Sequence, residues 1–165
     1  MDRSKVPAVL SIAGSDSSGG AGIQADIKTI TAHRLYAETA ITAITAQNTL
    51  GVTAVQNISP DIVAAQIDAV FDDIRPNAVK IGMVSSAEII DVIADRLSAW
   101  NATNVVVDPV MVATSGARLI AEDAAEALTR RLFPLATVIT PNIPEAMALL
   151  DYEVDSERTQ QNAAM

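Results

Sequence analysis

The segment from Ser11 to Lys28, SIAGSDSSGGAGIQADIK, places four glycines within nine positions, between an apolar run and a helical pattern. Glycine lets the backbone adopt positive φ and approach a ligand closely, and the first amides of a helix carry partial positive charge. The spacing therefore predicts a binding turn for an anionic or strongly polar small molecule. Asp16 before the turn and Asp26 in the following helix add polar groups that a plain connection does not need.

The same turn offers a second interpretation, because Gly20, Gly22 and Ala25 satisfy the dinucleotide pattern G-x-G-x-x-G/A. A dinucleotide site also needs an acidic residue about 20 positions later, which holds the ribose hydroxyls. Ala40 stands near that spacing instead. The sequence therefore argues against a dinucleotide-dependent oxidoreductase.

Further residues that core packing does not require follow the other predicted strands. They are Gln47 and Asn48, Gly82 and Met83, Asp108, and Asn142 with Glu145. Ligands of open parallel sheets bind beyond the carboxyl ends of the strands. We therefore expect these residues, together with Gly14 and Asp16, to meet at one edge of the sheet.

The chemistry of these side chains indicates phosphoryl transfer to a small heterocyclic alcohol. The amide of Gln47 is both donor and acceptor, which suits the edge of a heterocycle, and Met83 can lie against a ring face or simply fill the core. Asp108 and Glu145, with Asn142, supply oxygen atoms of the kind that hold Mg²⁺ beside nucleotide phosphates. Each has an ordinary alternative, since Asn142 suits a helix cap and Asp108 can brace a loop.

Strand and helix patterns alternate along the chain. Strands are predicted at 8–13, 39–46, 52–58, 79–81, 105–107 and 137–139, and helices at 23–32, 60–74, 86–100, 122–132 and 144–150. Ser59 and a capping box from Ser85 to Glu88 are predicted to begin two of the helices. This order predicts an α/β domain with a mainly parallel sheet and helices on both faces. Residues 155–165 are polar and without pattern.

Composition sets the outer limits of function. A chain of 165 residues, 50% hydrophobic, predicts a single domain over residues 1–165. The absence of cysteine excludes disulfides and thiolate metal sites, and one histidine, His33, excludes a histidine metal cluster. A net charge of −9 argues against binding to nucleic acid or an anionic membrane. Without a long apolar run or a signal segment, we expect a soluble cytoplasmic protein.

Five ordered segments closely resemble the hydroxymethylpyrimidine/phosphomethylpyrimidine kinases of thiamine biosynthesis, a ribokinase-like family. They are AGSDSSGGAGIQADIKT, ITAITAQNTLGV, KIGMV, VVVDPVMVATSG and ITPNIPEA, and the resemblance runs from Ala8 to about Tyr152. It implies a three-layer α/β/α fold, ATP and Mg²⁺ as cofactors, and an aminopyrimidine alcohol as substrate. The implied substrate contacts are Gly14, Asp26, Gln47, Met83 and Val110, with Gln47 on the aminopyrimidine edge. Asp108, Asn142 and Glu145 match positions near the nucleotide phosphates, with Asp108 and Glu145 as metal ligands.

The resemblance also implies further strands and a Gly-Thr-Gly loop that stabilises the transferring phosphoryl group. The last glycine of this chain is Gly116. We therefore expect a ribokinase-like sheet that is incomplete on its C-terminal side, no catalytic residue of that loop, weak ATP binding and slow phosphorylation. Pyridoxal kinase activity and a non-catalytic pyrimidine-binding module remain as alternatives, and a homodimer remains an open prediction.

Overall fold

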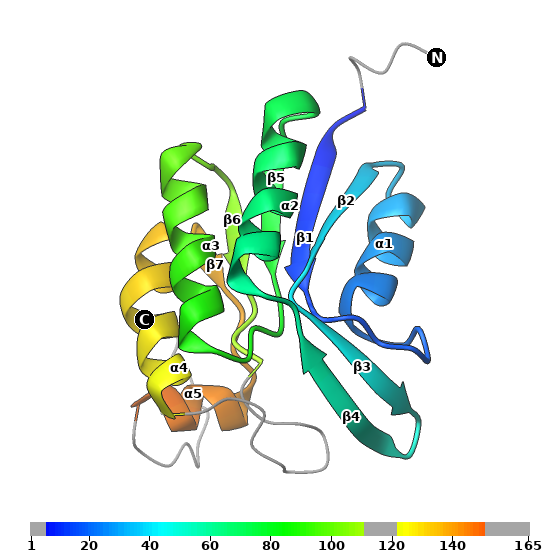
Figure 1. The fold of residues 1–165 in the computed structure, drawn as a ribbon, viewed down its shortest axis with the longest axis vertical. Helices are drawn as coiled ribbons and strands as arrows, with labels where there is room; N and C mark the ends of the chain where they lie inside the picture. The colour runs from blue at the N-terminus through cyan, green and yellow to red at the C-terminus, as the bar shows by residue number, and fades with distance from the viewer. Residues whose placement is uncertain (1–5, 111–121, 151–165) are drawn as a thin grey trace.

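The computed structural model describes residues 6–110 and 122–150. Its centre is a five-stranded parallel sheet in the order β2-β1-β5-β6-β7 (Figure 1). The strands are β1 (Ala8–Ala13), β2 (Tyr36–Ile41), β5 (Ala78–Ile81), β6 (Val105–Val107) and β7 (Val138–Ile139). A separate antiparallel ribbon is formed by β3 (Ala43–Asn48) and β4 (Gly51–Asn57). The predicted parallel α/β architecture is confirmed.

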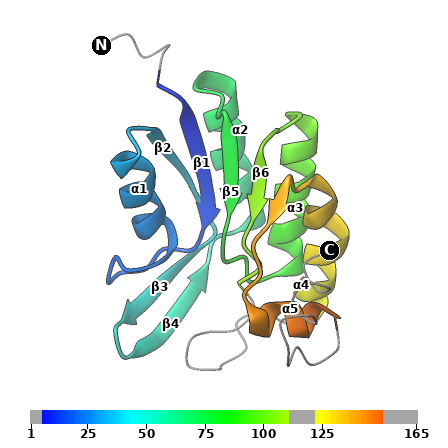
Figure 2. The same cartoon turned by 180° about the vertical axis from the view of Figure 1, so that it is seen from behind.

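Helices cover both faces of this sheet, and the last helix lies beyond the carboxyl ends of the strands, as the two opposite views show (Figures 1 and 2). The helices are α1 (Gly22–Ala32), α2 (Pro60–Asp73), α3 (Ala87–Ala99), α4 (Glu122–Ala127) and α5 (Ile143–Leu150). Successive strand residues point to opposite faces. Leu10 and Ile12 of β1 accordingly enter the core beneath α2 and α3, whereas Ser11 between them faces α1.

The predicted second strand at 39–46 is wrong as a single element, because the chain changes sheets at Thr42. Gln66 of α2 ends β2 by accepting from the Ile41 amide (2.9 Å) and donating to the Ile41 carbonyl (3.1 Å). The buried Thr42 donates its hydroxyl to the Met83 carbonyl (2.9 Å). The run of Ile and Thr suits either sheet equally, so its pattern does not reveal the break.

One predicted helix start is confirmed in position and another changes. Ser59 occupies the predicted N-cap position of α2, followed by Pro60, although its side chain makes no capping hydrogen bond. The N-cap of α3 is Ser86, one residue later than predicted, and its hydroxyl accepts from the Ile89 amide (3.3 Å). Ser85 instead donates to the side chain of Asn57 (2.8 Å). The two adjacent serines made the register of the capping box ambiguous.

The C-terminal part of the fold follows the predicted order. The helix predicted at 122–132 is α-helical to Ala127 and then π-helical over Leu128–Leu132. The predicted loop at Gly116 and the end at 155–165 lie outside the described residues. No helix in the described ranges is both long and apolar enough to cross a membrane.

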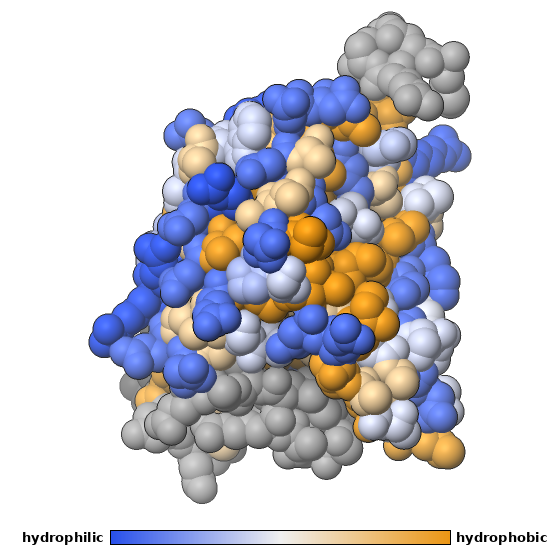
Figure 3. Space-filling model, in the orientation of Figure 1, coloured by the Kyte–Doolittle hydropathy of each residue, from blue (hydrophilic) through white to orange (hydrophobic). Residues whose placement is uncertain are grey.

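Apolar side chains also gather on the surface, around the N-terminal end of α2 and the beginning of the ribbon (Figure 3). Exposed apolar residues of these elements include Ile44, Val55 and Ile62. A two-stranded ribbon has little stability by itself. The ribbon therefore depends on its attachment to the turn after β1, which is described below.

Glu38 of β2 is a buried carboxyl group without a hydrogen-bond partner. Its side chain is on the same side of the strand as Ala40 of the core, the residue is 6% exposed, and neither carboxyl oxygen is paired. Burial raises the pKa of Glu38 to about 7, because the charged form loses its hydration.

Replacing this carboxyl group should change how stability depends on pH. The folded pKa lies above the ordinary value of 4.5, so the contribution of Glu38 to stability is greatest below pH 4.5 and is lost as the pH rises through 7. We expect Glu38→Gln to remove that decline and to be about 1–3 kcal/mol more stable than the native chain at pH 8. Urea unfolding between pH 4.5 and 8 measures this, with the exposed Glu88→Gln as control. Parallel pH profiles for the native chain and Glu38→Gln would contradict it.

Candidate functional site

A cavity of about 420 Å³ lies at the carboxyl ends of β1, β5 and β6. The sheet order reverses between β1 and β5, where open α/β sheets place their ligands. Seven predicted site residues line this cavity: Gly14, Asp16, Asp26, Gln47, Met83, Asp108 and Val110. The volume is that of a small-molecule site.

The glycine-rich turn is organised by its own carboxylate. Asp16 is 2% exposed and accepts hydrogen bonds from the amides of Ser18 (2.8 Å), Gly20 (2.9 Å) and Ala21 (2.8 Å). Desolvation opposes its ionisation, but the hydrogen bonds from Ser18, Ala21 and Gly20 outweigh it and hold the pKa of Asp16 below its ordinary value. Three amides of the turn are therefore already bound to the chain's own carboxylate.

Gly22 lets helix α1 begin directly on the end of β1. Its φ is +54°, and a Cβ atom there would collide with the Gly14 carbonyl oxygen. The same carbonyl accepts from the Ile23 amide (3.0 Å). This close start places Asp26, one turn further along α1, in the wall of the cavity.

The ribbon forms a second wall, and the turn holds it in place. Ser17 donates its hydroxyl to the Gln47 carbonyl (2.7 Å) and accepts from the Gln47 amide (2.8 Å). Thr45 donates to the Ser15 carbonyl (2.6 Å) and lies 3.3 Å from Oε1 of Gln47. Gln47 thus reaches the cavity from the ribbon, beside a bulge after Ala46, and not from the end of a central strand as the sequence predicted.

Apolar groups also line the cavity. A Cβ atom at Gly14 would be 2.6 Å from Cε of Met83, so the glycine provides room for the methionine. Val52 and Val55 of β4 also line the cavity. These surfaces suit a flat ring, since thioether and methyl groups pack against ring faces.

Asp108 directly follows β6 and is half-buried in the cavity wall. Burial raises the pKa of Asp108, the positive charge of Lys80 opposes that rise, and the negative charge of Asp26 adds to it. The cavity therefore holds a small cluster of charges, formed by Asp26, Lys80 and Asp108.

Asn142 and Glu145 lie outside the lining of this cavity. The Asn142 amide donates to Glu145 Oε2 (2.9 Å), and the Glu145 amide donates to Asn142 Oδ1 (2.9 Å). This is a reciprocal capping box at the start of α5. Among the described residues, no group of three His, Cys, Asp or Glu side chains is arranged to hold a metal. A joint metal site of Asp108 and Glu145 stays a prediction.

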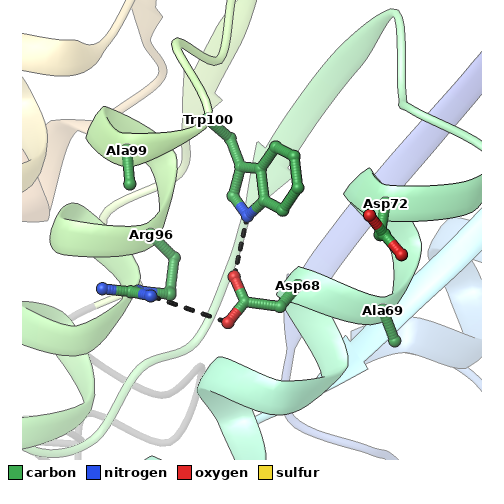
Figure 4. A pocket seen from close by; sticks show the side chains of 6 residues that line it. All are labelled: Asp68, Ala69, Asp72, Arg96, Ala99 and Trp100. Carbon is green, nitrogen blue, oxygen red and sulfur yellow. Dashed lines mark hydrogen bonds and ion pairs between the residues drawn. The ribbon is translucent and has the colours of Figure 1, made fainter.

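A second hollow, between α2 and α3, is a structural junction (Figure 4). Asp68 accepts from the Trp100 indole (2.7 Å) and lies 3.6 Å from the Arg96 guanidinium. Trp100 also stacks on Phe71, with ring centroids 5.7 Å apart. These polar groups already pair with one another, which leaves the sheet-edge cavity as the better candidate for a ligand.

Several residues of the site escaped the sequence prediction, and three of them contact predicted site residues through their side chains. They are Ser11 and Lys80, which contact Asp26, and Thr45, which contacts Gln47. For Lys80 the sequence did contain a signal, because a lysine between Val79 and Ile81 of a buried strand is unusual and indicates a functional position. Ser11 and Thr45 carried none, because hydroxyl residues are common in strands.

The sequence profile of the family described as phosphomethylpyrimidine kinase matches residues 16–165. A hydroxymethylpyrimidine/phosphomethylpyrimidine kinase of Rhizobium meliloti is 61% identical over 137 residues, which cover 83% of this chain and 51% of that protein. The crystal structure of phosphomethylpyrimidine kinase from Clostridium difficile superimposes with a TM-score of 0.91 at 52% identity, covering 95% of this chain and 68% of that one.

A pyridoxal kinase is also similar. The Staphylococcus aureus enzyme, solved in complex with AMP-PCP and pyridoxal, has a TM-score of 0.83 and 37% identity, covering 96% of this chain and 57% of that one. The chain spans about half the length of the curated hydroxymethylpyrimidine/phosphomethylpyrimidine kinases it matches first.

The geometry of the turn gives a paired prediction. We expect Gly22→Ala to lower the free energy of unfolding by at least about 2 kcal/mol, because the new methyl group meets a backbone carbonyl at positive φ. Gly20→Ala is the matched control: its nearest neighbour would be 3.7 Å away, and the change should stay within about 0.5 kcal/mol. Chemical denaturation measures both, and equal tolerance of the two would refute this role of Gly22.

Proposed function

The chain belongs to the phosphomethylpyrimidine kinase family, and on that premise we propose that it forms the substrate-binding part of an ATP-dependent kinase. The proposed substrates are 4-amino-5-hydroxymethyl-2-methylpyrimidine and its monophosphate, and residues 1–165 are proposed as one domain. The names of its relatives and the shape of the cavity support this reading.

The observation that carries the proposal is the position of Gln47. Gln47 lines the cavity from the ribbon, and its backbone is held in place by two hydrogen bonds with the hydroxyl group of Ser17. An aminopyrimidine presents an acceptor nitrogen next to a donor amine, and a glutamine amide can pair with both. Met83 and the ribbon valines would contact the faces of the ring, and Asp26 and Val110 would contact its substituents.

ATP and Mg²⁺ are proposed for the end of the cavity near Asp108. The Staphylococcus aureus pyridoxal kinase was solved with the nucleotide analogue AMP-PCP, which supports a nucleotide in this fold. Magnesium commonly uses one or two carboxylates and completes its shell with water and phosphate oxygens. Asp108 fits that requirement, and bound Mg²⁺ would neutralise phosphate charge there. Glu145 and Asn142 fit it less well, because they already cap α5.

The chain's own residues would bind and orient the alcohol. Asp26 offers an acceptor to a polar substituent, while Val52 and Val55 keep water from one face of the ring. The turn contributes no unpaired charge to this task, because the carboxylate of Asp16 already accepts hydrogen bonds from the amides of the turn. Pyridoxal, also an aromatic alcohol, is the second candidate substrate, and the pyridoxal kinase likeness favours testing it.

Ligand selectivity tests the proposal directly. We expect the pyrimidine alcohol to bind more tightly than pyridoxal, and Gln47→Ala to weaken pyrimidine binding by about 1–3 kcal/mol, the cost of leaving buried polar edges unpaired. Calorimetric titration of both ligands measures this. Gln56→Ala, an exposed glutamine on the same ribbon, is the control. Tighter binding of pyridoxal, or unchanged affinity in Gln47→Ala, would argue for the other substrate or against this site.

Asp108 gives a test that does not depend on turnover. We expect Mg²⁺ to strengthen ATP binding to the native chain, and Asp108→Asn to weaken binding in the presence of Mg²⁺ by about 3–10-fold. ATP titrations followed by NMR, with and without Mg²⁺, measure the effect. The control is Asp73→Asn, on the exposed side of α2. It removes the same charge and should leave the affinity for ATP unchanged, with and without Mg²⁺. If both variants behave alike, Asp108 does not contact the metal.

A further inference from the structure

Lys80 occupies an unusual place for a lysine. It lies in β5, an inner strand of the parallel sheet, opposite Ser11 of β1 and Val106 of β6. Inner strands of such sheets are usually continuous apolar runs, and its neighbours Val79 and Ile81 are buried. Packing alone therefore does not account for a cation at this position.

The ammonium group of Lys80 is paired with the carboxylate of Asp26. Its Nζ donates to Asp26 Oδ2 over 3.0 Å, and the fully buried Ser11 donates its hydroxyl to the same oxygen over 2.6 Å. The side chains of Lys80 and Asp26 are 28% and 19% exposed. Both donors thus converge on one carboxylate oxygen, and no described residue donates a hydrogen bond to the other, Oδ1.

The geometry also brings Lys80 to the cavity. Lys80, Asp26 and Asp108 all line it, and Lys80 is the single cationic side chain among the described lining residues. A Cβ atom at Gly82 would lie 2.7 Å from Nζ, so this glycine leaves the space through which the lysine bends to the carboxyl end of the sheet.

We propose that Lys80, assisted by Ser11, is a positioning residue that fixes the carboxylate of Asp26 through Oδ2 so that Oδ1 is presented to the substrate. This inference rests on the proposed function, because it concerns the same cavity. Two charged or strong hydrogen bonds on one oxygen fix the rotation of a carboxylate, and a fixed acceptor loses little entropy when a ligand donates to it.

An alternative is that the pair only stabilises the fold. Partly buried ion pairs are weak evidence for stability, because the desolvation of both ions offsets their attraction. A positioning role instead makes the effect of Lys80 on ligand binding depend on the presence of Asp26. A double-mutant cycle separates the two, since a purely structural lysine would act on binding independently of the carboxylate.

The test is the calorimetric affinity of the chain for the pyrimidine alcohol in Lys80→Met, Asp26→Asn and the double variant. We expect Lys80→Met to weaken binding at least about 10-fold, but to change it less than about 3-fold when Asp26→Asn is already present. Lys80→Arg should restore affinity to within about 3-fold of the native chain, because it keeps the charge and the donor. Arg130→Met is the charge-matched control and should bind normally, because its side chain is 76% exposed and pairs only with Glu126, outside the cavity lining.

Each outcome is decisive for one of the two proposals. Native-like affinity in Lys80→Met, or equal losses in both backgrounds, would overturn the role of Lys80 and leave the proposed substrate intact. Failure of the native chain to bind the pyrimidine alcohol would reject the substrate and this role with it. Should Lys80→Met fail to fold in a thermal melt, Ser11→Ala replaces it in the cycle, and an additive loss there would equally overturn the inference.

Discussion

The site is organised around the buried carboxylate of Asp16. By accepting from the amides of the glycine-rich turn, it fixes where helix α1 begins and hence where Asp26 lies in the cavity wall. The neighbouring Ser15 and Ser17 bind the ribbon, so Gln47 depends on the same turn. Because both walls are attached to it, one short segment sets the distance across the cavity.

This use of the turn also determines which ligands the cavity favours. A glycine-rich turn before a helix commonly receives phosphate, but here its amides hold an internal anion. The cavity keeps the carboxylates of Asp26 and Asp108, one lysine, and apolar surfaces from Met83 and the ribbon. A neutral heterocycle with donor groups matches that arrangement better than a free anion.

Much of the fold was predictable because it depends on local patterns. Buried strands such as Val105–Val107 and the apolar stripe of α3 appear in the sequence as short runs and helical spacing, and the parallel order follows from their alternation. The ribbon was not predictable in this way. The break at Thr42 is enforced by Gln66, which is distant in sequence, and the local pattern of Ile and Thr fits either sheet.

The same distinction applies within the site. Residues at strand ends, such as Gly14, Met83 and Asp108, could be predicted because the topology of a parallel sheet brings those ends together. The partners that orient them come from strand interiors or from the ribbon, and a strand pattern says nothing about which interior side chain faces a ligand. Lys80 illustrates the difference. Its contribution to the site becomes visible only once the fold brings it to Asp26 and Ser11, each of which lies on another element. Residues that line the cavity at strand ends are therefore easier to infer from sequence than the side chains that contact them from other elements.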